Sequence, residues 1–422
     1  MRLFRFSLLF TALLLAFSSF SQSISQWRGP HRDGHYPDKN LLSSWPAEGP
    51  NMVWSVEGIG KGYSTAVSDG KNIYITGKSG NDDELTAISK EGKILWQVPY
   101  GPAWSGSFPE SRCTPTVENG KAYVVSGSGT IACINTSDGK IVWSFDGLEK
   151  FKGAYGDWGV CESLLLSGNK LIYTPAGPAT TMVALNKETG ETTWASETLN
   201  DTSAYVSPLL VEFAGKKIIV TIINKYLVGV EESSGKILWK YDYSSLKSDK
   251  SLQIWPGAPK TNTITPLFKD GELYITGGYN HDGAKFRISP DASSIELLWT
   301  DSTLDCHMGG VVLQNGYIYG SNWFNNSMGD WCCLDWKTGK TLYEKNWFTK
   351  GAVIEADGKL YCFEEKSGNV ALVNPTPEKF DLISSFKTSM GTGPAWAHPS
   401  IYDGLLLVRR GDALMAFDIR QK

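Results

Sequence analysis

Residue types that could do chemistry recur at one position along this chain, directly before a series of turn dipeptides that end in glycine. Eight short segments occupy that position: residues 63–66, 112–115, 159–162, 205–208, 262–265, 306–309, 349–352 and 396–399. Their ionisable members are Arg112, Glu162, His307, Lys350 and His398. Two fixed cations beside one carboxylate suit an anionic ligand, and histidine is the side chain that exchanges protons near neutral pH.

These side chains divide into two predicted roles. The catalytic candidates are His307 and His398, which would exchange protons, and Glu162, which would orient a cation or a polar group. The predicted ligand-binding residues are Arg112, Lys350, Trp396, Tyr205 and Asn262. No spacing of Cys and His indicates a structural zinc site, so no metal ligands are predicted. The alternative is that a polar channel merely needs solvated or paired side chains.

The elements that must position these residues form an eightfold repeat. Each copy begins at a turn dipeptide that can supply a positive φ: Asp69-Gly70, Asn119-Gly120, Ser167-Gly168, Ala214-Gly215, Asp270-Gly271, Asn315-Gly316, Asp357-Gly358 and Asp403-Gly404. An aromatic residue closes each copy: Trp54, Trp96, Trp143, Trp194, Trp239, Trp299, Tyr343 and Phe386. The runs between turns, such as residues 72–76 and 122–126, alternate or are continuously apolar, which is typical of strands.

Four short strands in each repeat of roughly 45 residues predict the blade of a β-propeller. We therefore expect an all-β, eight-bladed propeller of four-stranded antiparallel blades. Trp54 precedes the first turn whereas the last copy lacks an outer strand, so Asn51–Val56 should complete the last blade and close the ring. Innermost strands line the axial channel of a propeller, so the ionisable residues should meet at one mouth of that channel.

The N-terminus has the features of a secretory signal. Arg2 and Arg5 precede the apolar run 8–17, and Ser19 and Ser21 place small residues before a cleavage point at Gln22. The predicted organisation is a signal peptide at residues 1–21, an arm at 22–50 and the propeller at 51–422. No later segment is apolar for the roughly 20 residues that a spanning helix needs. We expect a soluble, exported, periplasmic or secreted monomer.

The charge and the cysteine content of the chain argue against further classes of function. Lys and Arg total 40 against 44 Asp and Glu, which disfavours nucleic acid as a partner. The seven cysteines include no Cys-x-x-Cys-His, so no haem is attached. Cys332 and Cys333 are adjacent, but successive strand residues point to opposite faces, which favours buried thiols over a vicinal disulfide. Trp323, Phe324 and Trp331 could form an aromatic platform for a sugar or a polymer, although packing at the blade edge is favoured.

The repeat phrase at residues 131–143 (IACINTSDGKIVW) resembles the pyrroloquinoline-quinone (PQQ) repeat. Residues 26–30 (QWRGP), 32–34 (RDG), 158–163 (WGVCES) and 396–399 (WAHP) resemble segments of exported PQQ-like propellers, a group that includes quinoprotein and polyvinyl-alcohol dehydrogenases and relatives of the assembly factor BamB. The resemblance implies PQQ as a cofactor, with Arg112 and Lys350 in suitable blades to bind its oxygens.

The calcium site of quinoprotein dehydrogenases finds weaker counterparts. Residues 174–181 contain no carboxylate where the Glu ligand would come, and His307 stands near the place of the catalytic Asp, with Asp305 two residues away. Asn280 could supply the Asn, and Glu162 could substitute for the Glu. We therefore expect weak or absent PQQ-dependent oxidation without a bound calcium.

Two functions follow from this reading. The first is binding of a small anionic or quinone-like ligand at the charged mouth, with a PQQ-dependent oxidoreductase as its enzymatic form. The alternative is a non-catalytic, BamB-like scaffold that presents loops, such as residues 243–250, or a blade edge to a protein partner in the cell envelope.

Overall fold

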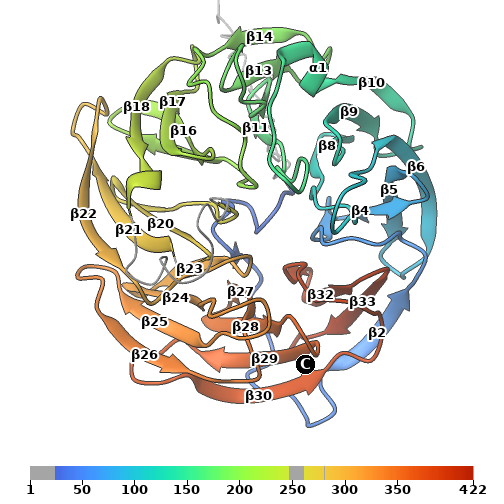
Figure 1. The fold of residues 1–422 in the computed structure, drawn as a ribbon. Helices are drawn as coiled ribbons and strands as arrows, with labels where there is room; N and C mark the ends of the chain where they lie inside the picture. The colour runs from blue at the N-terminus through green and yellow to red at the C-terminus, as the bar shows by residue number, and fades with distance from the viewer. Residues whose placement is uncertain (1–23, 247–260, 280, 422) are drawn as a thin grey trace, which may run out of the picture.

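The chain forms a ring of eight β-sheets, seen along its axis in Figure 1. The structure is a computed structural model and describes residues 24–246, 261–279 and 281–421. In each blade the strands follow one another from the axis outward. The first blade comprises β3 (Val67–Ser68), β4 (Asn72–Ser79), β5 (Asp82–Ser89) and β6 (Ile94–Pro102), and the second comprises β7 (Thr116–Glu118), β8 (Lys121–Val125), β9 (Thr130–Asn135) and β10 (Ile141–Asp146). The third blade comprises β11 (Leu165–Ser167), β12 (Lys170–Tyr173), β13 (Val183–Asn186) and β14 (Thr192–Ala195), and the fourth comprises β15 (Leu209–Phe213), β16 (Lys216–Ile222), β17 (Tyr226–Glu231) and β18 (Ile237–Asp242).

The next three blades continue the same up-and-down order. They comprise β19 (Leu267–Lys269), β20 (Glu272–Gly277), β21 (His281–Ile288), β22 (Ile295–Asp301); β23 (Val311–Gln314), β24 (Tyr317–Ser321), β25 (Trp331–Asp335), β26 (Thr341–Lys345); and β27 (Gly351–Ala356), β28 (Lys359–Glu364), β29 (Asn369–Asn374), β30 (Asp381–Lys387). Two short helical segments, α1 (Gly147–Phe151) and the single 3-10 turn η1 (Tyr243–Ser245), follow outer strands. The predicted eight-bladed propeller is confirmed.

The eighth blade combines the two ends of the described chain. Strands β31 (Ser400–Tyr402), β32 (Leu405–Arg410) and β33 (Ala413–Asp418) are joined by β2 (Asn51–Val56), which pairs antiparallel with β33. Figure 1 shows β2, in blue, beside the red strands of this blade. The predicted closure of the ring by residues 51–56 is therefore confirmed. A further strand, β1 (His35–Tyr36), pairs parallel with the inner strand β27 and anchors the N-terminal arm.

Four of the closing tryptophans link their blade to the next one by a hydrogen bond. The indole nitrogens of Trp54, Trp96, Trp143 and Trp194 donate to backbone oxygens of the following blade over 2.7, 3.3, 3.1 and 3.0 Å. Each ring also covers the glycine of that blade's outer turn; a Cβ added at Gly139 would lie 2.8 Å from the Trp96 ring. The excess of Trp and Gly is thus a packing device between blades.

The seventh blade departs from the predicted repeat. In the blades that close with a tryptophan, this residue lies directly after the bulge of the outer strand, as Trp143 does opposite Cys133. In β30 this position is held by Ser384, which lies opposite Leu372. Phe386 therefore lies two residues beyond the position of the closing tryptophans. The aromatic ring comes instead from the arm, because Trp45 packs on Tyr361 at 5.8 Å between ring centroids. The repeat pattern did not predict that Trp45 supplies this ring, because Trp45 lies far from β30 in the sequence.

The structure tests the expectations for the cysteines and for the aromatic side chains at residues 323–331. All seven cysteines are free thiols, so Cys332 and Cys333 form no vicinal disulfide. Six are buried, including Cys332 and Cys333, and Cys161 is half-buried. Trp323 and Trp331 are buried, which favours packing over a sugar platform. The predicted signal, the second half of the 243–250 loop and Asn280 lie outside the described residues.

Alanine substitutions at two turn glycines test the packing device. Gly139 and Gly358 have similar φ values, 72° and 74°, but a Cβ at Gly358 meets nothing within 4 Å. Both changes should cost roughly 1–2 kcal/mol for the left-handed backbone. Gly139→Ala should cost about 1–3 kcal/mol more, because the methyl group would overpack Trp96. Urea unfolding measures both, and equal losses would show that the Trp–Gly contact adds nothing.

Candidate functional site

A cavity of about 210 Å³ lies at the mouth of the ring where the inner strands begin. The eight segments that the sequence singled out precede these strands more often than they form them; Arg112, for example, comes before β7, which starts at Thr116. The segments therefore build the mouth of the channel, not its wall. Predicted site residues in the lining are Arg112, Tyr205, His307, Lys350, Trp396 and His398.

Two predicted residues do not line the cavity. Glu162 is buried, and its carboxylate accepts hydrogen bonds from the backbone N–H and hydroxyl of Thr174 over 3.0 and 3.3 Å. Burial raises the pKa of Glu162 to about 8 despite the nearby Arg32 guanidinium. The Asn262 amide donates to the backbone oxygens of Ile223 and Asn224. Both side chains hold loops together around the mouth, so the expected convergence with Glu162 is not observed.

The N-terminal arm crosses the axis of the ring (Figure 1). Its Trp27 lines the cavity. Arg32 donates to the backbone oxygens of Ser163, Leu164 and Pro208 in the third and fourth blades. Arg28 donates to Val311 and Val353 in the sixth and seventh blades. Burial lowers the pKa of both guanidinium groups. Because these donors are occupied by carbonyl groups, they brace the ring and are not open to a ligand.

His398 is fixed in one neutral form. Its Nδ1 lies 2.9 Å from Nη1 of Arg28, which can only donate, so Nδ1 is the acceptor. Its Nε2 therefore carries the proton and donates to the Met308 backbone oxygen, also over 2.9 Å. Burial, reinforced by Arg28, lowers the pKa of His398 to about 3. Both ring nitrogens are occupied, so this residue shapes the cavity and has no nitrogen left for a ligand.

His307 is neutral as well, but its ring is open to the cavity. Burial, followed by the Lys350 charge, lowers its pKa to about 3. Among the described residues, no hydrogen-bond partner occupies its ring nitrogens; the only bond at this residue goes from the Thr263 hydroxyl to the backbone oxygen. Tyr279 packs edge-on against the ring at 4.8 Å. His307 can therefore offer a neutral donor or acceptor to a ligand, without a charge change near pH 7.

Lys350 is a paired cation. Its ammonium contacts a carboxylate oxygen of Glu365 and donates to the Asn326 backbone oxygen over 3.2 Å. Both side chains are more than nine-tenths buried. Burial raises the pKa of Glu365, although the Lys350 ammonium opposes that shift. The pair therefore presents little net charge to the cavity, whereas Lys350 was predicted to be a cation that binds the ligand.

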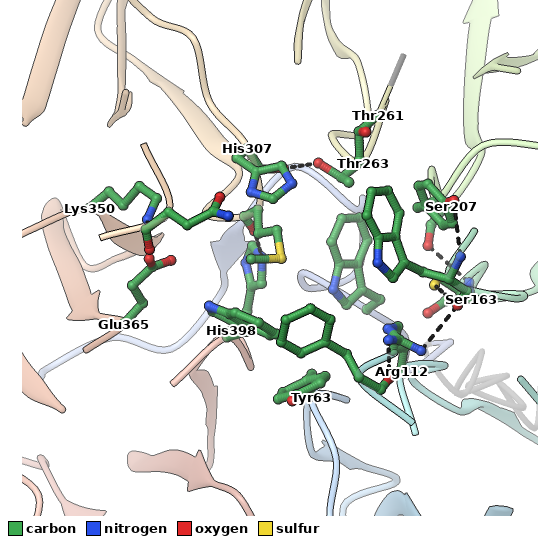
Figure 2. Close-up of a pocket in the computed structure, with 18 of the residues that line it drawn as sticks. Tyr63, Arg112, Ser163, Ser207, Thr261, Thr263, His307, Lys350, Glu365 and His398 are labelled. Carbon is green, nitrogen blue, oxygen red and sulfur yellow. Dashed lines mark hydrogen bonds and ion pairs between the residues drawn. The ribbon is translucent and has the colours of Figure 1, made fainter. Parts of the chain in front are cut away.

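Arg112 remains as a cation that can act on a ligand. Figure 2 shows it across the cavity from Lys350 and Glu365. Its guanidinium donates to the backbone oxygens of Trp158, over 3.2 Å, and Phe108. Within the described part of the chain it forms no ion pair with a carboxylate. Since a guanidinium has five N–H donors, some remain for an anion beside the Tyr63 ring, 6.0 Å away.

Aromatic side chains make up much of the remaining wall, as Trp27, Tyr63, Phe108, Trp158, Tyr205, Tyr279 and Trp396. Trp396 lies 4.8 Å from Tyr63 and 5.3 Å from Phe108 between ring centroids. Trp158 and Tyr205 are 5.4 Å apart on the Arg112 side. Flat apolar surfaces of this kind bind the faces of planar molecules.

Sequence reasoning missed several of these residues for identifiable reasons. Trp27 stands in the arm, outside the repeat, although the QWRGP segment marked that region as unusual. Tyr63 and Trp158 stand inside or beside the recognised segments but carry no charge, so they were not selected. Phe108 lies in an irregular connection, and Glu365 follows a second strand, so neither had a positional signal.

No group of three or more His, Cys, Asp and Glu side chains arranged to hold a metal occurs in residues 24–246, 261–279 and 281–421. In the same residues, no helix is long and apolar enough to cross a membrane. The cavity itself combines the open guanidinium of Arg112 and the open imidazole of His307 with aromatic walls.

The fold and the site define the class: an eight-bladed β-propeller with a cavity at one mouth of its axis. A family model described as outer membrane protein assembly factor BamB matches residues 81–372. The chain belongs to this family of PQQ-like propellers, which confirms the resemblance found in the sequence.

Individual relatives are distant. A protein of Rickettsia conorii described as uncharacterized is 25% identical over 212 residues, and the match spans 46% of each chain, so this chain spans less than half the length of that relative. BamB from Moraxella catarrhalis has a TM-score of 0.62 at 15% identity, with 87% of this chain and 99% of that chain covered. Quinohemoprotein alcohol dehydrogenase from Comamonas testosteroni has a TM-score of 0.67 at 13% identity, with 93% and 79% covered.

A computationally designed protein, Ika8, is also similar, with a TM-score of 0.59 at 11% identity and coverage of 87% of this chain and 99% of that chain. BamB, an alcohol dehydrogenase and a designed protein thus share the architecture. At these identities the likeness shows the fold alone, and function must be argued from the cavity.

Proposed function

We propose that this protein binds a small, flat, anionic organic molecule in the mouth cavity. The observation that carries the proposal is Arg112, whose guanidinium lacks an ion-pair partner among the described residues and lies in an aromatic-walled cavity. A carboxylate on the ligand would take free N–H groups of Arg112, and its ring would lie against the aromatic wall. The open nitrogen of His307 would bind a polar group at the other side.

The geometry favours binding over acid–base catalysis. His398 has no free nitrogen, and the pKa of His307 lies near 3, far from the range in which a general base works at neutral pH. Glu162, the third catalytic candidate, lies outside the cavity lining. We therefore assign His307 to ligand recognition by hydrogen bonding.

The residues fit PQQ only in part. PQQ is a flat quinone with several carboxylates, and the aromatic walls and Arg112 suit its ring and one of these groups. The second expected cation, Lys350, is already paired with Glu365. A hard cation such as calcium needs roughly six oxygen ligands, and the described residues around the cavity do not supply a set of that kind. The calcium-dependent arrangement therefore does not fit, and no reaction step is derived through it.

Calorimetric titration with naphthoate, and with neutral naphthamide as its matched control, tests the proposal. Naphthoate should bind more tightly than naphthamide because only the carboxylate pairs with Arg112. Arg112→Ala should weaken naphthoate binding by roughly 1.5–3 kcal/mol, the value of a hydrogen bond to a charged group. Naphthamide binding should change little, and so should the melting temperature.

Arg287→Ala is the control variant, because Arg287 is an exposed arginine in β21, away from the cavity lining. PQQ, with and without calcium, is titrated in parallel. Equal affinities for naphthoate and naphthamide, or an Arg112→Ala variant that binds as well as the wild type, would contradict the assigned role of Arg112.

A protein-binding scaffold is a second proposal, supported by exposed apolar side chains near the mouth. Phe324, Met328 and Phe348 are 43%, 56% and 59% exposed, and they flank segments that contribute Asn326 and Lys350 to the cavity. A scaffold should bind neither naphthoate nor PQQ, and its partner affinity should survive Arg112→Ala. Export, expected from residues 1–21, is part of both proposals.

A further inference from the structure

Phe108 combines exposure, a left-handed backbone and contact with the proposed ligand site. The residue has a φ of 52°, a conformation that is unfavourable for a bulky side chain. Its side chain is 50% exposed although it lines the cavity. A buried core position does not explain this arrangement, since half of the ring faces solvent. Strained residues of this kind persist where surrounding contacts hold them in place.

Two contacts hold Phe108 over the mouth. Arg112 donates a hydrogen bond to the Phe108 backbone oxygen, and the Phe108 ring packs edge-on against Trp396 at 5.3 Å. Phe108 belongs to the β6–β7 connection, whereas Trp396 belongs to the β30–β31 connection. The contact therefore joins the second blade's entrance to the eighth blade's entrance, across the segment of the first blade that carries Tyr63.

We propose that Phe108 is a gating residue, which covers the Arg112 side of the cavity and limits the rate at which ligand and solvent exchange. The inference rests on the proposed function and deepens it. Arg112 links ligand binding to the position of Phe108, because the guanidinium that donates to the Phe108 backbone oxygen is also the group that binds the anion. An aromatic contact such as Phe108–Trp396 is worth roughly a factor of two to ten in an equilibrium.

The chain supplies a matched control at Phe348. Phe348 has a φ of 53° and is 59% exposed, and it lies in another connection between an outer and an inner strand. It does not line the cavity. Substitution of either Phe by Gly relieves the backbone strain, since Gly adopts positive φ readily. Only the change at Phe108 should affect exchange with the cavity.

The chain also supplies a reporter that needs no ligand. Cys161 lines the cavity and is half-buried, whereas the other six cysteines are buried. Burial raises the pKa of the Cys161 thiol to about 11, so alkylation by iodoacetamide should be slow and its rate should follow access to the cavity. Peptide mass spectrometry measures this rate, and Cys161→Ser identifies the labelled site.

Phe108→Gly and Phe108→Ala should each increase the rate of Cys161 alkylation and the dissociation rate of naphthoate by about tenfold. Phe108→Trp should restore slow exchange, and Phe348→Gly should leave both rates unchanged. Stopped-flow fluorescence measures the dissociation rate.

The outcomes separate the inference from the proposed function. If naphthoate fails to bind the wild type, both the proposed function and this inference are contradicted. If naphthoate binds but both rates are the same in wild type and Phe108→Gly, only the gating role is overturned. Equal acceleration in Phe348→Gly would also overturn it, because the effect would then come from general loosening of the mouth.

Discussion

Deleting residues 22–57 is expected to abolish the cooperative unfolding transition of the propeller. The deletion removes β2, the outer strand of the eighth blade, and leaves β33 with an unpaired edge. It also removes Trp54, whose indole donates to the Lys90 backbone oxygen in the first blade. The ring would then be open between its eighth and first blades.

The arm contributes to the same expected loss from the centre of the ring. Arg28 and Arg32 donate to five backbone oxygens at the entrances of four blades, and the deletion would leave those buried acceptors without partners. Each buried acceptor left unsatisfied costs about 1–3 kcal/mol. The total reaches the 5–15 kcal/mol by which native domains are stable.

Circular dichroism during heating measures the outcome, with a chain that begins at residue 22 as the reference. The truncated chain should show no sharp transition and should aggregate through its open sheet edge. A truncated chain that unfolds cooperatively within a few degrees of the reference would show that β2 and the arm are accessory to the ring.

The parts of the fold that sequence could predict are those that repeat. Turn glycines and closing tryptophans recur in register, so blade number, strand order and the closing strand could be derived from local patterns. Ser384 shows the limit, because its missing ring is replaced by Trp45 from a distant segment. Such a replacement depends on tertiary contact and leaves no mark in the repeat itself.

The site was predictable in position but not in charge state. Residues before each inner strand do meet at one mouth, since their place in the repeat fixes their place in the ring. What each side chain does there depends on partners outside these segments: Arg28 of the arm donates to His398, Glu365 pairs with Lys350, and Thr174 donates to Glu162. These partners lie outside the aligned segments, so the repeat pattern contains no information on which side chains pair.

Replacing Lys350 with methionine is expected to produce the largest loss of stability for a single change at the site. Both members of the Lys350–Glu365 pair are buried, so Lys350→Met would leave a carboxylate without its cation. Breaking a buried pair in this way costs about 3–5 kcal/mol. The change keeps a similar side-chain length, so the loss comes from the uncompensated charge and not from a cavity.

The pH dependence identifies the cause of that loss. The pKa of Glu365 is already raised in the folded protein by burial, and removal of the ammonium, which opposes the shift, should raise it further. A carboxyl whose folded pKa exceeds its unfolded value of about 4.3 contributes stability below that pH, and the contribution is lost as pH rises through the folded pKa. Lys350→Met should therefore be close to wild type near pH 4 and most destabilised at neutral pH.

Urea unfolding of Lys350→Met, Glu365→Gln and the double variant at several pH values tests this argument. In the double variant no buried charge is left unpaired, so stability at neutral pH should recover most of the loss. The two single changes should then be strongly non-additive, as expected for side chains in direct contact. A pH-independent loss in Lys350→Met, or additive losses in the double variant, would instead assign the effect to packing around Asn326 and the mouth loops, and the pair would have no electrostatic role in holding the cavity.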